Sequence, residues 1–147
     1  MVVKIYLIGS LRNPQVPILA TKLRTATGFD VFDDWHAAGP TADDSWQHYE
    51  QQERGHTYQE ALAGHAADHV FEYDKLHLDH SDAAVLVLPA GKSAHLEFGY
   101  IIGQGKPGWI LMDGEPERFD VMYRFANRVC YTVEELITCL TKFGSSS

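Results

Sequence analysis

The sequence has little that would link it to secretion, to a membrane or to nucleic acid. Its two cysteines, Cys130 and Cys139, are too few for the disulfide framework of a small secreted protein. No apolar run reaches the roughly 18 residues that a membrane-spanning helix requires, and the N-terminal residues lack the features of a signal peptide. A formal net charge of −8 disfavours binding to duplex nucleic acid. We therefore expect a cytoplasmic protein that binds neither a membrane nor a duplex.

What the chain does contain is an alternation of apolar strands with helical segments. Short apolar or β-branched runs predict strands at residues 2–8, 29–32, 83–88, 109–112 and 129–131. Helical patterns occupy residues 16–25, 45–52, 58–80 (one long or broken helix), 95–103, 120–126 and 132–142. This alternation predicts an α/β fold, in which a doubly wound parallel sheet of the flavodoxin or Rossmann kind lies between two layers of helices. We expect a single domain over residues 1–143 and a disordered tail at 144–147.

Three polar loops follow the predicted strands, at residues 9–14, 33–39 and 89–97. Ligands of parallel α/β sheets bind beyond the carboxyl ends of the strands, so these loops are the candidate binding loops. The first contains Gly9, Ser10 and Arg12 just before a helix, an arrangement that suits an anion because helix N–H groups and guanidinium groups both bind phosphate. A tight turn with a surface arginine explains the same residues without a ligand.

The third loop leads into a helix that carries Glu97 about one turn from its start. A carboxylate there can point into a cleft at the edge of the sheet, while Phe98 and Ile101 pack behind it. The alternative is an acid that only stabilises the helix dipole, by a few tenths to about 1 kcal/mol.

The residues around Glu97 resemble the nucleoside 2-deoxyribosyltransferase family. In that family a glutamate precedes a Phe/Leu-Gly pair on a helix that ends in GKP, as in SAHLEFGY at 93–100 and GKP at 105–107. KIYLIG at 4–9 is similar to the family's first strand, which carries a tyrosine near its end. The string GSLR at 9–12 is closer to the branch that hydrolyses nucleoside 5′-monophosphates, where Ser and Arg hold the phosphate. Residues 34–69 match no part of the family pattern.

The resemblance implies cleavage of the N-glycosidic bond of a (deoxy)nucleoside or its 5′-monophosphate, without a cofactor, and transfer of the sugar to water or another base. Glu97 would be the nucleophile, Asp74 would protonate or hold the base, and Tyr6 would orient Glu97. Retaining glycosidases divide their chemistry between two carboxyl groups in a similar way. The transferase branch has an aspartate six residues before the nucleophile, where this chain has Gly91. The candidate substrate-binding residues are Gly9, Ser10, Arg12, Asp33, Asp34, Trp35, Gly91 and Ser93.

Family members are homo-oligomers in which a neighbouring subunit helps to close the site. The helix around Glu97 is apolar nearly all round, which predicts burial on more than one face and places the subunit interface there. A lid packed on the fold is an alternative role for residues 33–36, and a core tyrosine is an alternative for Tyr6.

Eight histidines also suggest a metal site. His65 and His69 have an i,i+4 spacing that suits zinc, but a third ligand and the glutamate of the zinc-protease motif are missing, so we predict no metal. Two other functions remain open. One is an NAD-cleaving enzyme like the TIR domains, which also place a catalytic glutamate on a helix beside a parallel sheet. The other is a nucleotide sensor that keeps residues 9–12 and does not depend on Glu97.

Overall fold

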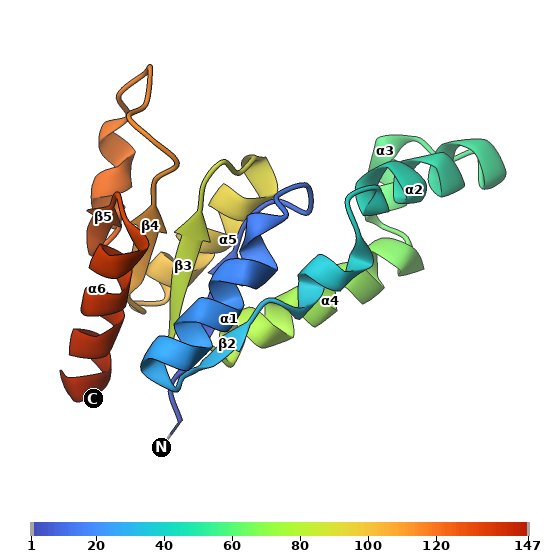
Figure 1. The fold of residues 1–147 in the computed structure, drawn as a ribbon. Coiled ribbons are helices and arrows are strands. Elements are labelled where there is room, and N and C mark those ends of the chain that lie inside the picture. Colours follow the sequence, from blue (N-terminus) through green and yellow to red (C-terminus); the bar gives the residue numbers. More distant parts are fainter. Residues whose placement is uncertain (1, 147) are drawn as a thin grey trace.

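A five-stranded parallel sheet forms the centre of the computed structural model, which describes residues 2–146 (Figure 1). Its strands are β1 (Lys4–Ile8), β2 (Asp30–Phe32), β3 (Ala83–Val87), β4 (Gly108–Leu111) and β5 (Arg128–Cys130). They lie in the order β2-β1-β3-β4-β5, which is the flavodoxin-like order of a doubly wound sheet. The predicted fold class is therefore confirmed, and each predicted strand is present with ends shifted by one or two residues.

Helices cover both faces of the sheet, and the side chains of β1 alternate between them. Ile5 and Leu7 pack in the core formed with α1 (Gln15–Thr27) and α6 (Val133–Ser146). Tyr6 and Ile8 pack in the core formed with α4 (His65–Asp79) and α5 (Lys92–Gly103). This alternation follows from the period of two in a strand. It places Tyr6 on the same face as the two helices that carry Asp74 and Glu97.

Between β2 and α4 the chain forms an arm that stands away from the sheet (Figure 1). The segment begins with the 3-10 helix η1 (Asp34–Ala38), which packs on the sheet through Trp35. The arm itself then contains α2 (Ala42–His48), the π-helical η2 (Tyr49–Glu53) and α3 (Tyr58–Leu62). The helix predicted over residues 58–80 is thus broken, between α3 and α4. Inside the arm, buried Glu50 lies 2.6 Å from His56 Nδ1. The arm therefore has a polar contact of its own that helps to hold it together.

The C-terminal helix is longer than predicted. α6 continues through Ser146, so residues 144–146 are helical and do not belong to a disordered tail, while Ser147 lies outside the described residues. Packing explains the extension: Gly144 approaches Phe29 so closely that an added Cβ would lie 2.5 Å from a ring carbon. The hydroxyls of Ser145 and Ser146 also donate hydrogen bonds to the carbonyls of Thr141 and Lys142.

The other differences concern local helix type. The segment predicted as helical at 120–126 is a 3-10 helix, η3 (Val121–Phe125), and α5 begins at Lys92, three residues earlier than predicted. In the part of the chain that the structure describes, no helix combines the length and the apolar character needed to cross a membrane.

Candidate active site

The carboxyl ends of β1 and β3 form the topological switch point of the sheet. The two strands are neighbours, with Ile8 paired to Leu86, but the chain leaves β1 for α1 on one face and leaves β3 for α5 on the other. Crevices at such points bind ligands in open α/β sheets. An added Cβ on Gly9 would lie 3.6 Å from Val87, so the loop after β1 runs close to the end of β3. The predicted binding loops at 9–14 and 89–97 therefore both start from this switch point.

The side chains of Glu97 and Tyr6 contact each other on the face of the sheet that α4 and α5 cover. Tyr6 is 1% exposed, and its hydroxyl donates a hydrogen bond of 3.3 Å to Glu97 Oε2. Glu97 is half-buried on α5, whose buried residues Ala94, Phe98 and Ile101 face the core. The structure thus contains the contact that the sequence predicted between these two side chains.

Asp74 brings a second carboxyl group to the same place, from α4. Its negative charge raises the pKa of Glu97 and also that of Tyr6. Burial raises the pKa of Asp74 itself above its ordinary value. The three side chains, from β1, α4 and α5, therefore share one electrostatic environment.

The environment of Glu97 brings its ionisation close to neutral pH. Burial is the largest cause, followed by the charge of Asp74, and the hydrogen bond from Tyr6 acts in the opposite direction, so that the pKa of Glu97 is about 7. The pKa of Tyr6 is raised far above its ordinary value, first by burial and then by the charge of Glu97. Tyr6 thus remains a hydrogen-bond donor at all physiological pH values, whereas Glu97 can hold or release a proton.

An aromatic wall adjoins these groups on the side of β2. The Phe32 ring lies 5.1 Å from the Tyr6 ring and 6.2 Å from the Tyr73 ring, and it stacks on His77 at 4.0 Å. His77 is held in turn by Lys4, whose Nζ lies 3.2 Å from Nδ1 of the imidazole. The wall helps to shield Tyr6 from water. No local sequence pattern predicts this wall, because only the strand pairing of β1 with β2 brings Phe32 next to Tyr6.

Two of the three candidate substrate-binding residues at 33–35, Asp33 and Trp35, make contacts within the fold. Asp33 forms an ion pair of 2.7 Å with Arg24 of α1. Trp35 donates a 2.7 Å hydrogen bond from Nε1 to the carbonyl of Leu7 and packs against the cores on both faces. Asp34 is exposed. Asp33 and Trp35 are therefore tied into the fold, which corresponds to the alternative of a packed lid.

The loop at residues 9–14, the candidate anion-binding loop, makes weak contacts within the protein. Gly9 is needed for close packing, because an added Cβ would lie 3.1 Å from a methyl group of Val16. Ser10 Oγ accepts a 3.1 Å hydrogen bond from the backbone N–H of Arg12. The Arg12 guanidinium pairs with Asp44 of the arm at 3.4 Å, with side chains 70% and 66% exposed. Exposed pairs of this kind contribute only about 0.2–1 kcal/mol, so a phosphate can displace this contact.

At the start of α5, the backbone of Gly91 contacts a residue that the sequence analysis missed. Gly91 and Ser93 are exposed there, and the carbonyl of Gly91 lies 2.7 Å from Nδ1 of His95. The other ring nitrogen of His95 lies 2.9 Å from the hydroxyl of Tyr123 in η3. No sequence pattern links His95 to Tyr123, which is 28 residues away, and only the packing of η3 against α5 joins them.

Within residues 2–146, no three His, Cys, Asp or Glu side chains are grouped so that they could hold a metal ion. His65 and His69, the pair with zinc-like spacing, lie exposed on α4.

The electrostatic coupling in this cluster can be measured without a substrate. Asp74→Asn removes a negative charge beside Glu97 and is expected to lower the Glu97 pKa. Tyr6→Phe removes a hydrogen bond to the ionised carboxylate and is expected to raise it. The measurement is a 13C NMR titration of the glutamate carboxyl carbons, with Glu97→Gln to assign the signal. Unchanged pKa values, or shifts in the same direction, would show that the three groups do not interact as the structure indicates.

Comparison with known proteins identifies a similar fold but no family. No protein-family model matches the sequence, and no curated protein sequence is significantly similar to it. The structure is similar to that of the Clostridium botulinum CMP N-glycosidase BcmB, with a TM-score of 0.52 and 14% sequence identity. The similarity covers 93% of this chain and 97% of that chain. At this level of identity it shows a shared fold that extends over nearly the whole of both chains.

Proposed function

We propose that this protein cleaves the N-glycosidic bond of a nucleoside 5′-monophosphate or nucleoside, with Glu97 as the nucleophile. The observation that carries the proposal is the cluster of Glu97, Tyr6 and Asp74 at the switch point of the sheet. It provides a carboxyl group with a pKa of about 7, a hydroxyl that fixes it, and a second carboxyl group nearby. The similar fold of an enzyme described as a CMP N-glycosidase supports the same substrate class.

The mechanism follows from the different states of the two carboxyl groups. Ionised Glu97 attacks C1′ of the sugar as the bond from C1′ to the base nitrogen breaks, and an ester between the sugar and Glu97 results. Asp74 carries the proton of the pair in this reactive form, although burial and the charge of Asp74 raise the pKa of Glu97 to about 7, and Asp74 donates that proton to the leaving base. In the second step ionised Asp74 takes a proton from water, which attacks C1′ and releases Glu97 as a carboxylate. This is the double displacement of retaining glycosidases applied to an N-glycoside.

Tyr6 has a positioning role in this mechanism. Its hydroxyl donates to Glu97 Oε2 and leaves the other carboxylate oxygen available to the sugar. Its strongly raised pKa means that it keeps its proton throughout the reaction. We propose water as the acceptor of the sugar, because the GSLR string resembles the hydrolase branch of the family and Gly91 replaces the aspartate of the transferases.

Glu97→Gln is expected to abolish release of free base while the fold is retained. The assay offers the parent and the variant a panel of nucleosides, 5′-monophosphates and NAD, and chromatography detects the base. Normal turnover by the variant would exclude Glu97 as the nucleophile. Release of nicotinamide alone by the parent would instead favour an NAD-cleaving enzyme.

The same substitution has an expected effect on stability that distinguishes lost chemistry from lost folding. The raised Glu97 pKa means that the folded state binds this proton more tightly than the unfolded state, so the parent loses stability as pH rises from about 4.5 to about 7. Glu97→Gln lacks this titration. Its free energy of unfolding relative to that of the parent should therefore increase across that pH window, by up to about 3 kcal/mol. Urea unfolding at pH 4.5 and pH 8 measures the difference. A variant less stable than the parent at both pH values would indicate a structural role.

Arg12→Ala tests the proposed contact with phosphate. A charge-assisted hydrogen bond contributes about 1.5–3 kcal/mol, so kcat/KM for the 5′-monophosphate should fall roughly tenfold to over a hundredfold and that for the nucleoside should barely change. Arg128→Ala is the matched control, because it breaks an arginine–carboxylate pair with Glu135 on β5 and α6. Equal losses on both substrates would show that Arg12 acts through the fold alone.

We also propose that the chain is a homo-oligomer, with an interface different from the one expected on α5. Phe98 and Ile101 of α5 are buried against the chain's own sheet, so most of the apolar surface of that helix is already covered. Helix α4 carries a group of exposed apolar side chains, of which Val70, Phe71 and Leu76 each expose more than half of their surface. They lie on the helix that connects the arm to the body (Figure 1).

Phe71→Asp is expected to shift the assembly toward monomer, because it places a charge in the proposed interface. Leu96→Asp, at an exposed apolar position on α5, is the matched control and should leave the mass unchanged. Light scattering at micromolar concentration decides between the two surfaces. A parent mass near 16.5 kDa would contradict the oligomer.

A further inference from the structure

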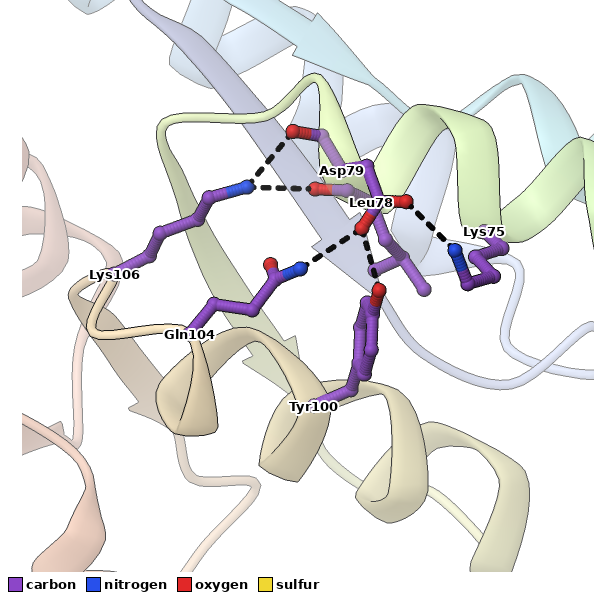
Figure 2. A network of polar contacts seen from close by, with 6 residues as sticks. All are labelled: Lys75, Leu78, Asp79, Tyr100, Gln104 and Lys106. Carbon is purple, nitrogen blue, oxygen red and sulfur yellow. Dashed lines mark hydrogen bonds and ion pairs between the residues drawn. The ribbon is translucent and has the colours of Figure 1, made fainter.

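A second polar network, outside the proposed active site, joins α4 to α5 (Figure 2). Asp79, at the C-terminal end of α4, accepts hydrogen bonds at Oδ1 from the hydroxyl of Tyr100 at 2.6 Å and from Nε2 of Gln104 at 2.9 Å. Its Oδ2 accepts a 3.0 Å bond from Nζ of Lys75. The Lys106 ammonium donates to the backbone carbonyls of Leu78 and Asp79 at 3.3 and 2.9 Å. The Asp79 carboxylate is thus bonded by Tyr100 of α5, by Gln104 at the C-cap of α5, and by Lys75 of α4.

The network adds to the contacts that α4 makes with the sheet through Leu78 and through Tyr73 and His77, which pack on Phe32. Leu78, in the last turn, is the buried residue of this helix, and most of the preceding turns are exposed. Lys106 also stabilises the last turn by binding its free carbonyls at the negative end of the helix dipole. Helix α4 is therefore held mainly at its C-terminal end, and the rest of the helix extends from that point toward the arm.

The network lies close to the proposed catalytic carboxyl groups along both helices. Asp79 follows Asp74 by five residues on α4, and Tyr100 follows Glu97 by three residues on α5. At 1.5 Å per residue these separations correspond to about 7.5 and 4.5 Å along the helix axes. A shift of α4 at Asp79 would therefore be carried directly to Asp74, because a helix moves as a rigid element over so few turns.

We infer that Asp79 is a positioning residue, which through its bond to Tyr100 holds Asp74 at its working distance from Glu97. The catalytic meaning of this inference rests on the proposed function. The geometric claim does not, since it concerns only the placement of α4 against α5.

The charges around both carboxylates are consistent with this role. Asp79 is bonded by Tyr100 of α5, by the C-cap residue Gln104 and by Lys75 from its own helix, and these bonds hold its pKa well below the ordinary range. The Asp79 carboxylate therefore stays ionised at any pH at which the enzyme would work. Glu97 is faced by Tyr6 from β1 and by Asp74 from α4. Loss of the Asp79–Tyr100 hydrogen bond would reduce both the burial of Glu97 and the effect of the Asp74 charge on the Glu97 pKa.

The test is the 13C titration of Glu97 in Tyr100→Phe, which keeps the ring and removes the hydroxyl. We expect the Glu97 pKa to fall from about 7 toward its ordinary value, since both causes that raise it are weakened. Asp79→Asn, which removes the charge and keeps the shape, should shift the pKa in the same direction. Tyr131→Phe is the matched control, because it deletes a tyrosine–carboxylate bond to Glu115 elsewhere, and it should leave the Glu97 pKa unchanged.

A Glu97 pKa equal to the parent's in both Tyr100→Phe and Asp79→Asn would overturn the inference, even if both variants had a lower Tm, because the network would then contribute to stability alone. The titration needs no substrate, so absence of base release by the parent would contradict the proposed function and leave this result intact. If the parent is active, kcat in Tyr100→Phe should fall by roughly tenfold or more with little change in KM, as expected when reacting groups are displaced by a fraction of an ångström to 1 Å.

Discussion

Partial burial of the Glu97 carboxyl group is the constraint on which the rest of the proposed site depends. A carboxylate removed from water is destabilised unless hydrogen bonds replace the lost hydration, and here the donor that the structure supplies is the Tyr6 hydroxyl. Successive side chains of β1 point to opposite faces of the sheet. Because Ile5 and Leu7 fill the core on one face, Tyr6 must point to the other face, where α5 packs. The position of the site is therefore a consequence of how the sheet is covered.

The two carboxyl-bearing helices are attached to the sheet in different ways. Helix α5 buries Ala94, Phe98 and Ile101, so Glu97 stands on a rigid element. Helix α4 is anchored through its last turn, and its other end joins the projecting arm (Figure 1). Glu97 thus stands on the more deeply packed helix, and we infer that the position of Asp74 depends on the Asp79 network. The arm joins the N-terminal end of α4, the end that lies away from Asp79.

Local patterns predicted most of the framework because its elements are marked by short-range features. The β-branched run of β1, the apolar run of β3 and the helical spacing of α1 each predicted an element that the structure contains. The resemblance then singled out Glu97, Tyr6 and Asp74, which lie in one environment. The contacts that local patterns do not predict are those between distant segments. Phe29 packs closely against Gly144 near the end of α6, and Arg24 forms an ion pair with Asp33. The indole N–H of Trp35 donates a hydrogen bond to the carbonyl of Leu7.

The interactions that sequence analysis did not find have the same origin. Asp79 and Tyr100 are 21 residues apart, and His95 and Tyr123 are 28 apart, with no motif that connects either pair. Both pairs arise from the packing of one element against α5. A single sequence records the residue types at such contacts but not which of them meet, so these pairs become visible only when the helices are placed on the sheet.

The central claim is that Glu97 forms a covalent bond with the sugar, and its most direct test is peptide mass spectrometry of the enzyme quenched with acid during turnover of a 5′-monophosphate. The peptide containing Glu97 should have its mass increased by that of the sugar phosphate, and no such peptide should form in Glu97→Gln. Release of base with no adduct, or with the adduct on another residue, would contradict it.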